Sequence, residues 1–225
     1  MLKHGGQIIP SFESDSTNED TCQSEDNNFR IFVPLCGKTV DMAFLAKQKS
    51  VSQVVGVDGI RKALTAFAEE NPSLEIKTEF DNEVNEVVER LPGKGIELLR
   101  GDLFDLNDEV TNGKFHMILD RASIVAIQPD LREKYVETMG KLIQPGGSIL
   151  LLTFDRRSGT DEAMKSGPPF SVDEKEVRRL YEKCEWVDKV TLVDEFDEFQ
   201  DEKMKAKMQG LDSLFELCFI ISAKK

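Results

Sequence analysis

From Phe29 onward the chain alternates between strand-like and helix-like segments, and this alternation limits the choice of fold more than any other feature. Runs of β-branched, aromatic or continuously apolar residues alternate with stretches whose apolar residues recur at helical spacing. This pattern is typical of a parallel sheet covered by helices on both faces. We therefore predict an α/β fold with a doubly wound, mostly parallel sheet of seven strands at FRIFVPLC, VSQVVGVD, IELLRGD, FHMILD, SILLLTFD, KVTLVDEF and ELCFIISA.

The end of the chain and one internal stretch depart from simple alternation. The last two strand-like runs finish the chain, and we expect them to form a C-terminal antiparallel hairpin. The helix LREKYVETMGKLI is expected to close at Pro145-Gly146-Gly147. Residues 73–96 leave two alternatives open, an extra hairpin or a short helix around EVNEVVERL.

The segment before Phe29 has a different composition. Residues 11–28 read SFESDSTNEDTCQSEDNN and offer almost nothing to bury. We therefore predict a flexible acidic arm over 1–28 and a single folded domain over 29–225. The sequence shows no long apolar stretch and no secretory signal, so we expect a cytoplasmic protein without a membrane partner.

Net charge and residue counts exclude several classes of function. The formal net charge is −13, and the sequence has no cluster of Lys and Arg that could bind a phosphate backbone. We therefore do not expect the protein to bind nucleic acid. The four cysteines do not stand at metal-ligand spacing, and we expect reduced thiols and no metal. Of the two histidines, His4 lies in the predicted arm and His116 lies inside an apolar run. We interpret His116 as a packed strand residue, which disfavours histidine-based hydrolase chemistry.

The turn after the first predicted strand is Pro34-Leu35-Cys36-Gly37-Lys38. In an open parallel sheet this turn forms the floor of the ligand crevice. Gly37 allows the backbone to approach a ligand, but a single glycine does not make the G-x-G-x-x-G cradle for a pyrophosphate. The turn therefore argues against NAD or FAD and suits a nucleoside cofactor without phosphates, such as S-adenosylmethionine (SAM). An ordinary tight turn remains the alternative.

Acidic residues follow the next two strands. Asp58 ends the second strand, 21 residues after Gly37, where a carboxylate can accept hydrogen bonds from both hydroxyls of a ribose. Its alternative roles are a helix N-cap or a solvated charge. Asp102 follows the third strand, where it can meet the exocyclic amine of an adenine, with Leu103 and Phe104 as apolar walls. Asp102 is equally suited to forming a turn.

Asp120 and Arg121 end the fourth predicted strand, which is otherwise apolar. Charges at the end of a buried strand are costly unless they are used. Arg121 can bind the α-carboxylate of SAM while Asp120 orders the neighbouring backbone. An internal Asp–Arg pair is the alternative.

Several motifs together resemble the thiopurine S-methyltransferase family over nearly all of residues 30–225. They are VPLCGKTVDMAFLA, VVGVD, MILDRASIVAIQPDLREKYVETM, GPPFSVDEKEVRRLY and GLDSLFELCFI. The resemblance implies a Rossmann-like SAM-dependent methyltransferase domain, with S-adenosylhomocysteine as the product. It places the family's SAM-contacting positions at Leu35, Asp58, Asp102, Leu103 and Arg121. The family typically has Glu at the ribose position, so Asp58 is a shorter carboxylate in a similar role.

The resemblance also implies a small-molecule acceptor, with an aromatic or heterocyclic thiol expected. A thiol of lowered pKa arrives partly as thiolate and needs no dedicated base, so no catalytic residue is assigned. Pro169 and Phe170 in the Gly-Pro-Pro-Phe loop, and Lys205, are the candidate acceptor contacts. A solvated charge on a mobile loop is the alternative for Lys205. The alternatives are halide, thiocyanate, selenium or tellurium acceptors, a non-catalytic SAM-binding protein, or an NAD-dependent oxidoreductase. We expect a monomer.

One departure from the family concerns tryptophan. Family members carry an N-terminal segment with paired tryptophans that folds over the cofactor, whereas Trp186 is the single tryptophan of this chain. Two interpretations stay open: a more open acceptor site, or a sequence that lacks its natural N-terminus. In the first case we expect weaker SAM retention and broader acceptor access.

Overall fold

A computed structural model describes residues 28–79 and 87–225 of the chain. The predicted acidic arm lies outside these residues, apart from its last position, and so does the first part of EVNEVVERL.

Within the described residues, eight strands form one sheet in the order β3-β4-β2-β1-β5-β6-β8-β7. All seven predicted strands are present, and the α/β fold class with a mostly parallel sheet is confirmed. They are β1 (Phe29–Val33), β2 (Val51–Asp58), β4 (Ile96–Arg100), β5 (Phe115–Arg121), β6 (Ile143–Gly159), β7 (Val187–Asp197) and β8 (Leu211–Ala223).

The additional strand is β3 (Glu89–Gly93), so the expected number of seven strands is too low by one. β3 pairs antiparallel with β4, and Leu91 lies opposite Leu98. The two strands are joined by Lys94-Gly95, with Gly95 at a φ of +70°. β3 reads ERLPG, a polar sequence with a proline, and it is a strand because β4 provides a partner. The extra-hairpin alternative for residues 73–96 is therefore correct for the described part of that stretch.

The chain divides into two compact units, residues 1–117 and 118–225, and each is described by itself. In the first unit β2 pairs in parallel with both β1 and β4. The helical segments of this unit are α1 (Val40–Leu45), α2 (Arg61–Glu70), η2 (Pro72–Leu74) and η3 (Leu103–Asp105). β1, β2 and β4 are buried along most of their length, as expected of central parallel strands, with Phe32, Val55 and Leu98 completely inaccessible.

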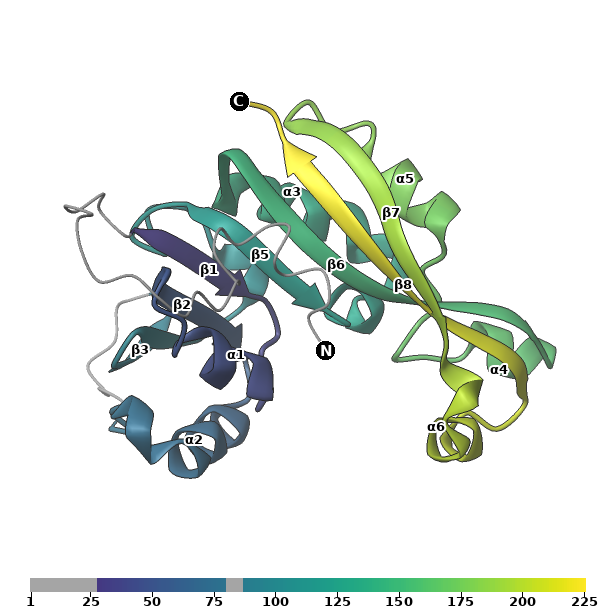
Figure 1. The fold of residues 1–225 in the computed structure, drawn as a ribbon, viewed down its shortest axis with the longest axis horizontal. Helices are drawn as coiled ribbons and strands as arrows, with labels where there is room; N and C mark the ends of the chain where they lie inside the picture. Colours follow the sequence, from purple (N-terminus) through teal and green to yellow (C-terminus); the bar gives the residue numbers. More distant parts are fainter. Residues whose placement is uncertain (1–27, 80–86) are drawn as a thin grey trace, which may run out of the picture. The chain divides into compact units, whose positions relative to one another are not determined.

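In the second unit β8 lies between β6 and β7 and pairs antiparallel with both (Figure 1), which confirms the C-terminal hairpin. Its helical segments are η4 (Ile124–Ala126), η5 (Pro129–Leu131), α3 (Arg132–Leu142), α4 (Asp161–Lys165), α5 (Glu174–Tyr181), η6 (Glu198–Gln200) and α6 (Glu202–Lys207). The expected closure of α3 at Pro145 is wrong, because the helix ends at Leu142 and β6 begins at the next residue.

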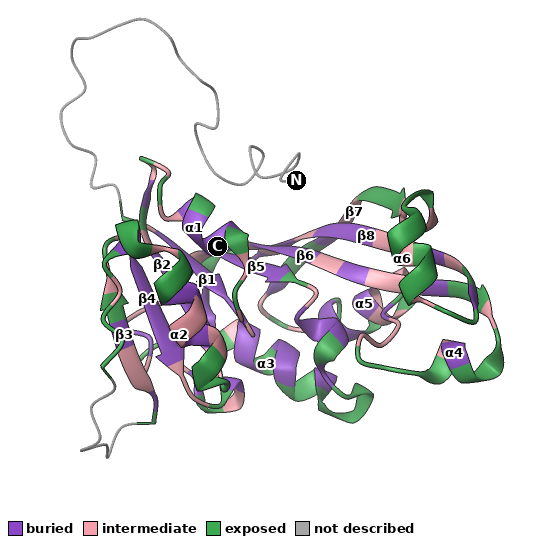
Figure 2. Ribbon diagram, turned by 90° about the horizontal axis from the view of Figure 1, so that it is seen from below, coloured by how far each residue is buried: buried purple, intermediate pink, exposed green. Residues whose placement is uncertain are grey.

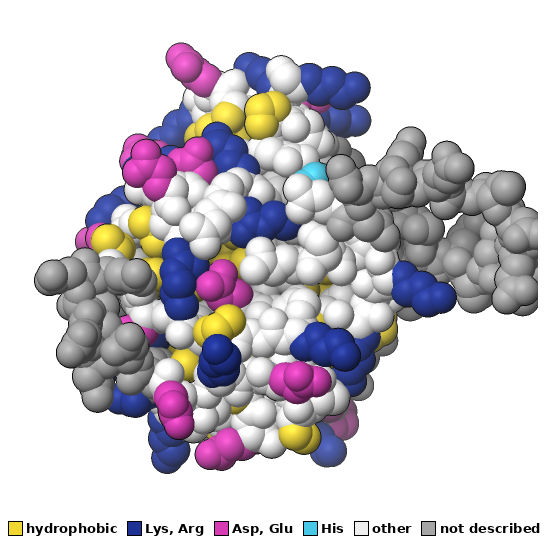
Figure 3. Space-filling model, turned by 90° about the vertical axis from the view of Figure 1, so that its left-hand side faces the viewer, with side chains coloured by type: hydrophobic (Ala, Val, Ile, Leu, Met, Phe, Trp, Pro, Cys, Tyr) yellow, Lys and Arg dark blue, Asp and Glu magenta, His cyan; other side chains and the backbone are white. Residues whose placement is uncertain are grey.

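Burial follows the helical spacing in this unit. α5 buries Val177, Leu180 and Tyr181 along one face, whereas α6 has no buried residue and is mostly exposed in Figure 2. In the described part of the chain no helix is both long and apolar enough to cross a membrane. One face of the molecule, seen in Figure 3, carries basic and acidic side chains interspersed.

Candidate functional site

The carboxyl ends of three strands of the first unit meet at one edge of the sheet. Val33 near the end of β1 is in register with Gly56 of β2, and Asp58 at the end of β2 is in register with Arg100 of β4. The turns that follow these strands therefore lie side by side. An ideal Cβ on Gly59 would stand 3.8 Å from the carbonyl oxygen of Gly101, which shows how closely two of the turns approach.

The turn after β1 bends sharply twice. Leu35 has a φ of +43° and Gly37 a φ of +50°, both in the left-handed region. A leucine there is strained, whereas glycine adopts this conformation without cost from a side chain. The N–H of Cys36 donates to the carbonyl of Val57 at 2.8 Å, and the N–H of Gly37 donates to Asp58 Oδ2 at 2.9 Å. Two hydrogen bonds thus connect the turn directly to the end of β2.

Asp58 connects two turns through its two carboxylate oxygens. Oδ2 accepts from Gly37, and Oδ1 accepts from the N–H of Ile60 at 2.8 Å. The N-cap of α2 is Ile60, so the N-cap alternative for Asp58 is wrong. A carboxylate can accept about four hydrogen bonds. Each oxygen of this half-buried side chain therefore keeps acceptor capacity for a ligand.

The turn after β4 is capped by Asp102. Its Oδ1 accepts from the N–H of Phe104 at 2.9 Å, so the expected turn-forming role is present. The side chain of Leu103 is only 3% exposed and packs in the core of the unit, whereas Phe104 is half-buried. Leu103 is the first residue of η3, so its N–H has no acceptor within that turn. This N–H and Asp102 Oδ2 are the donor and the acceptor that the turn can offer to a ligand.

These observations fit an adenosine-type ligand. Five of the six residues predicted to contact the cofactor belong to the first unit and lie on the three adjoining turns: Leu35, Gly37, Asp58, Asp102 and Leu103. The three turns bring together a backbone bend without an intervening side chain, an acceptor for two hydroxyls, and the donor and acceptor that an adenine edge requires.

Arg121, the sixth predicted residue, belongs to the second unit and is exposed at the end of β5. Two carboxylates share its surroundings, Glu198 of η6 and Glu216 of β8. Burial raises the pKa of both carboxyl groups. The charge of Asp201 further raises the pKa of Glu198, the charge of Glu198 further raises that of Glu216, and Arg121 lowers both. Sequence reasoning missed these glutamates, although a charge inside the apolar run of β8 was a usable indication for Glu216.

Asp120 precedes Arg121 and is completely buried. Its Oδ1 accepts from the N–H groups of Ser123 and Ile124 at 2.9 and 3.2 Å, and its Oδ2 accepts from the hydroxyl of Tyr135 at 2.7 Å. Burial raises the pKa of Asp120 to about 6, and these hydrogen bonds oppose the rise. The carboxylate thus orders the turn after β5, as predicted.

The predicted acceptor residues also lie in the second unit. Pro169 and Phe170 are half-buried, and the N–H of Phe170 donates to the carbonyl of Val125 at 2.7 Å. Lys205 is an exposed residue of α6. α4 and α6 share a small apolar cluster of Ala163, Leu211 and Leu214 with Phe154, Met164, Phe199, Met204 and Met208. Lys205 therefore stands on a helix packed near the start of the Gly-Pro-Pro-Phe loop, and not on an isolated loop.

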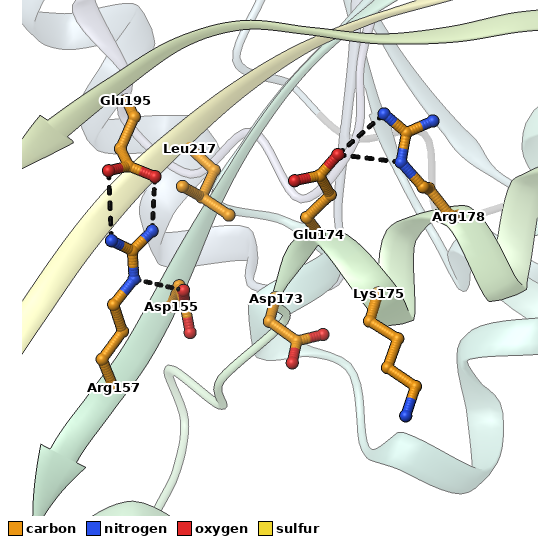
Figure 4. Close-up of a pocket in the computed structure, with 8 residues that line it drawn as sticks. All are labelled: Asp155, Arg157, Asp173, Glu174, Lys175, Arg178, Glu195 and Leu217. Carbon is orange, nitrogen blue, oxygen red and sulfur yellow. Dashed lines mark hydrogen bonds and ion pairs between the residues drawn. The ribbon is translucent and has the colours of Figure 1, made fainter.

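A separate cavity of about 500 Å³ opens between the N-terminal end of α5 and the strands β6, β7 and β8. Figure 4 shows Arg157 bound to Glu195 and Asp155, and Arg178 bound to Glu174. None of the predicted site residues lines this cavity, and its arginines are engaged in ion pairs. It does not belong to the candidate site.

Histidine and cysteine occupy structural positions. His116 Nδ1 accepts a hydrogen bond from the backbone N–H of Arg30 at 3.2 Å. The pKa of His116 is lowered, mainly by burial and also by the positive charge of Arg30. The interpretation of His116 as a packed strand residue is confirmed. Burial, with Asp58 nearby, raises the pKa of the Cys36 thiol. No cluster suited to a metal ion occurs among residues 28–79 and 87–225.

Comparison with known proteins decides the family. The protein-family model described as Thiopurine S-methyltransferase (TPMT) matches residues 18–224. The chain belongs to the thiopurine S-methyltransferase family. A thiopurine S-methyltransferase of Nitrosospira multiformis is 35% identical over 198 residues, which cover 87% of this chain and 81% of that protein. One from Vibrio atlanticus is 32% identical over 194 residues and covers 86% and 81%.

A solved structure supports the fold of this family member. Phosphoethanolamine N-methyltransferase 2 of Haemonchus contortus, in complex with SAM, superimposes with a TM-score of 0.58 at 14% identity, over 88% of this chain and 49% of that chain. The family model and the two relatives confirm the resemblance expected from the sequence motifs. This thiopurine S-methyltransferase family member is a SAM-dependent methyltransferase.

Proposed function

We propose that this methyltransferase transfers a methyl group to the sulfur of a small aromatic or heterocyclic thiol. We further propose that it binds SAM on the turns after β1, β2 and β4. The observation that carries the cofactor proposal is the hydrogen bond from the Gly37 N–H to Asp58 Oδ2. It holds a glycine, which has no side chain, beside a carboxylate that can accept further hydrogen bonds.

Each residue of the site has a proposed role. Asp58 accepts hydrogen bonds from the two ribose hydroxyls, the Leu103 N–H donates to an adenine ring nitrogen, and Asp102 accepts from the exocyclic amine. Leu35 and Gly37 bring the backbone against the nucleoside. Arg121 binds the α-carboxylate, with Asp120 fixing the turn that carries it.

The chemistry requires positioning more than proton transfer. Bound SAM supplies an electrophilic methyl group on a sulfonium. The protein has to hold the acceptor sulfur in line with that methyl group, at about 3–3.5 Å. We propose that Phe170 and Pro169 provide the apolar surface for the acceptor ring, and that Lys205 favours an anionic thiolate. An aromatic thiol ionises near neutral pH, so no general base is required.

Two other acceptor hypotheses remain distinct from this one. Halide, thiocyanate and selenium or tellurium nucleophiles are small and anionic, and Lys205 would favour them as it favours a thiolate. A non-catalytic SAM-binding protein would bind SAM on the same turns but would not methylate an acceptor. No observation on the described residues favours either over the thiol acceptor.

The proposal includes the partners and the location. With a net charge of −13 and the mixed charges visible in Figure 3, we propose that the protein acts on a small molecule and does not bind nucleic acid. We also propose a monomer in the cytoplasm, where unpaired thiols such as the buried Cys36 and Cys218 stay reduced.

The test combines binding and turnover. Calorimetry with SAM and with S-adenosylhomocysteine measures cofactor binding, with NAD as the negative control. Turnover is then measured with thiophenol, iodide, thiocyanate and a selenol. We expect binding of both adenosyl ligands and the highest kcat/KM with thiophenol. SAM binding without turnover of any acceptor would favour the non-catalytic hypothesis. A higher kcat/KM with iodide than with thiophenol would favour a halide acceptor over the thiol.

A further inference from the structure

Arg156 of β6 is a buried cation, only 5% exposed, and within residues 28–79 and 87–225 its guanidinium donates to neutral oxygens. Nη1 donates to the carbonyls of Ala163 and Ser166 at 2.5 and 2.6 Å and to the hydroxyl of Ser166 at 2.7 Å. Nη2 donates to the carbonyl of Pro169 at 2.5 Å. One side chain therefore spans seven residues, from the middle of α4 to the Gly-Pro-Pro-Phe loop.

A buried charge in this position is costly unless its hydrogen bonds are made. Burial lowers the pKa of Arg156, and four short hydrogen bonds to oxygen compensate for the lost hydration. A planar guanidinium presents five N–H donors in a fixed fork, which suits three separated residues better than the compact point charge of a lysine ammonium. The residue therefore acts as a brace for a segment that has little regular secondary structure.

The braced segment is held from two other sides. The N–H of Phe170 donates to the carbonyl of Val125, and the buried Arg132 of α3 donates to the carbonyl of Ser171 at 3.2 Å. The ring of Phe170 lies against Gly167, where an ideal Cβ would stand 2.2 Å from Phe170 Cδ1. Ser166–Phe170 is thus a fixed platform and not a freely moving flap.

We propose that Arg156 is a positioning residue for methyl transfer: its guanidinium fixes the Ser166–Phe170 platform against which the acceptor is placed. This inference rests on the proposed function, in which Pro169 and Phe170 contact the acceptor. Arg156 does not touch the acceptor itself. Loosening the platform displaces the acceptor sulfur from the line of transfer, which costs rate even though every contact group is still present.

The experiment compares Arg156→Lys with Arg157→Lys, an adjacent arginine that is exposed and paired with Glu195. Three quantities are measured on the full chain: the SAM dissociation constant by calorimetry, KM and kcat for thiophenol, and amide hydrogen exchange of residues 163–170. For Arg156→Lys we expect kcat/KM for thiophenol to fall about ten- to a hundredfold, mostly through kcat, with faster exchange of the platform. We expect SAM affinity to change by less than about twofold, because the proposed adenosine contacts lie in the other unit. Arg157→Lys should match the wild type in all three.

The outcomes separate this inference from the proposed function. Wild-type turnover is measured first, and if iodide is methylated and thiophenol is not, the thiol proposal fails and the variants are compared with iodide. If no acceptor is turned over, both proposals fail. Unchanged kcat/KM despite faster platform exchange, or unchanged exchange, overturns the role of Arg156 alone. If Arg156→Lys does not fold, Ser166→Ala removes one acceptor of the brace, and a smaller change in the same direction is then expected.

Discussion

The hydroxyl of Tyr135 in α3 donates a 2.7 Å hydrogen bond to Asp120 Oδ2, and neither side chain has any accessible surface. The other oxygen of Asp120 accepts from Ser123 and Ile124, on the far side of Ala122, whose φ is +62°. A non-glycine residue in this conformation is strained and persists where its surroundings fix it. The Asp120–Tyr135 pair therefore holds a bent turn directly after Arg121.

Replacing Tyr135 by phenylalanine removes the donor and leaves Asp120 Oδ2 buried with one hydrogen bond fewer. We expect the free energy of unfolding to fall by about 1–3 kcal/mol, the cost of an unsatisfied buried polar group. Urea denaturation measures it. Tyr181→Phe is the matched control, because the Tyr181 hydroxyl is buried without a hydrogen-bond partner within the described residues, and its loss should be close to neutral or stabilising. Equal destabilisation by both variants would contradict the role given to Tyr135.

The titration of Asp120 should make stability depend on pH. Its pKa in the folded protein is about 6 against an ordinary 3.8, so the folded state binds the proton more tightly than the unfolded state. The corresponding stabilisation is complete below pH 3.8 and is lost as the pH rises through 6. Between pH 5.3 and 7.5 we expect Asp120 to contribute a loss of about 1 kcal/mol. Asp120→Asn does not titrate, so the wild type should lose this much relative to the variant in urea denaturation at the two pH values. A difference between the two proteins that is the same at both pH values would show that Asp120 titrates normally.

Gly56 in β2 leaves room for the turn after β1. A Cβ at this position would stand 2.5 Å from Met42 Sδ and 2.9 Å from Cys36 Sγ. Gly56→Ala therefore overpacks the core, and we expect a loss of about 1–3 kcal/mol in the free energy of unfolding. The control is Gly59→Ala, whose Cβ would meet its nearest atom at an ordinary 3.8 Å. The packing argument fails if the two variants are equally stable.

Asp58 is predicted to determine cofactor affinity. Asp58→Ala removes the acceptor of the Gly37 N–H and the proposed ribose contacts, so we expect the SAM dissociation constant in calorimetry to rise about tenfold or more. Asp58→Glu, which restores the carboxylate typical of the family, should bind more tightly than Asp58→Ala. Asp105→Ala changes an exposed aspartate of η3 and should leave affinity unchanged. If Asp58→Ala binds SAM as tightly as the wild type does, the proposal that SAM binds on the turns after β1, β2 and β4 is wrong.

The sequence alone determined the order of the strands along the chain and the turns that carry the candidate cofactor residues. Apolar runs and helical spacing depend on neighbours in sequence, so β1, β2 and β4 were recognisable without the tertiary structure. Gly37 and Asp58 could likewise be assigned to one edge of the sheet, because the ends of parallel strands lie side by side. Their direct hydrogen bond could not be foreseen, since it depends on the bend at Leu35.

Only the tertiary structure decided which polar residues are buried and what they bind. Arg156 and Arg157 are adjacent and chemically identical in sequence, yet one braces a loop from the interior and the other forms exposed ion pairs. β3 is a strand because β4 stands beside it, and the partner of Asp120 is a tyrosine 15 residues away. Such contacts depend on which distant parts of the chain pack together, and the local sequence pattern does not predict this.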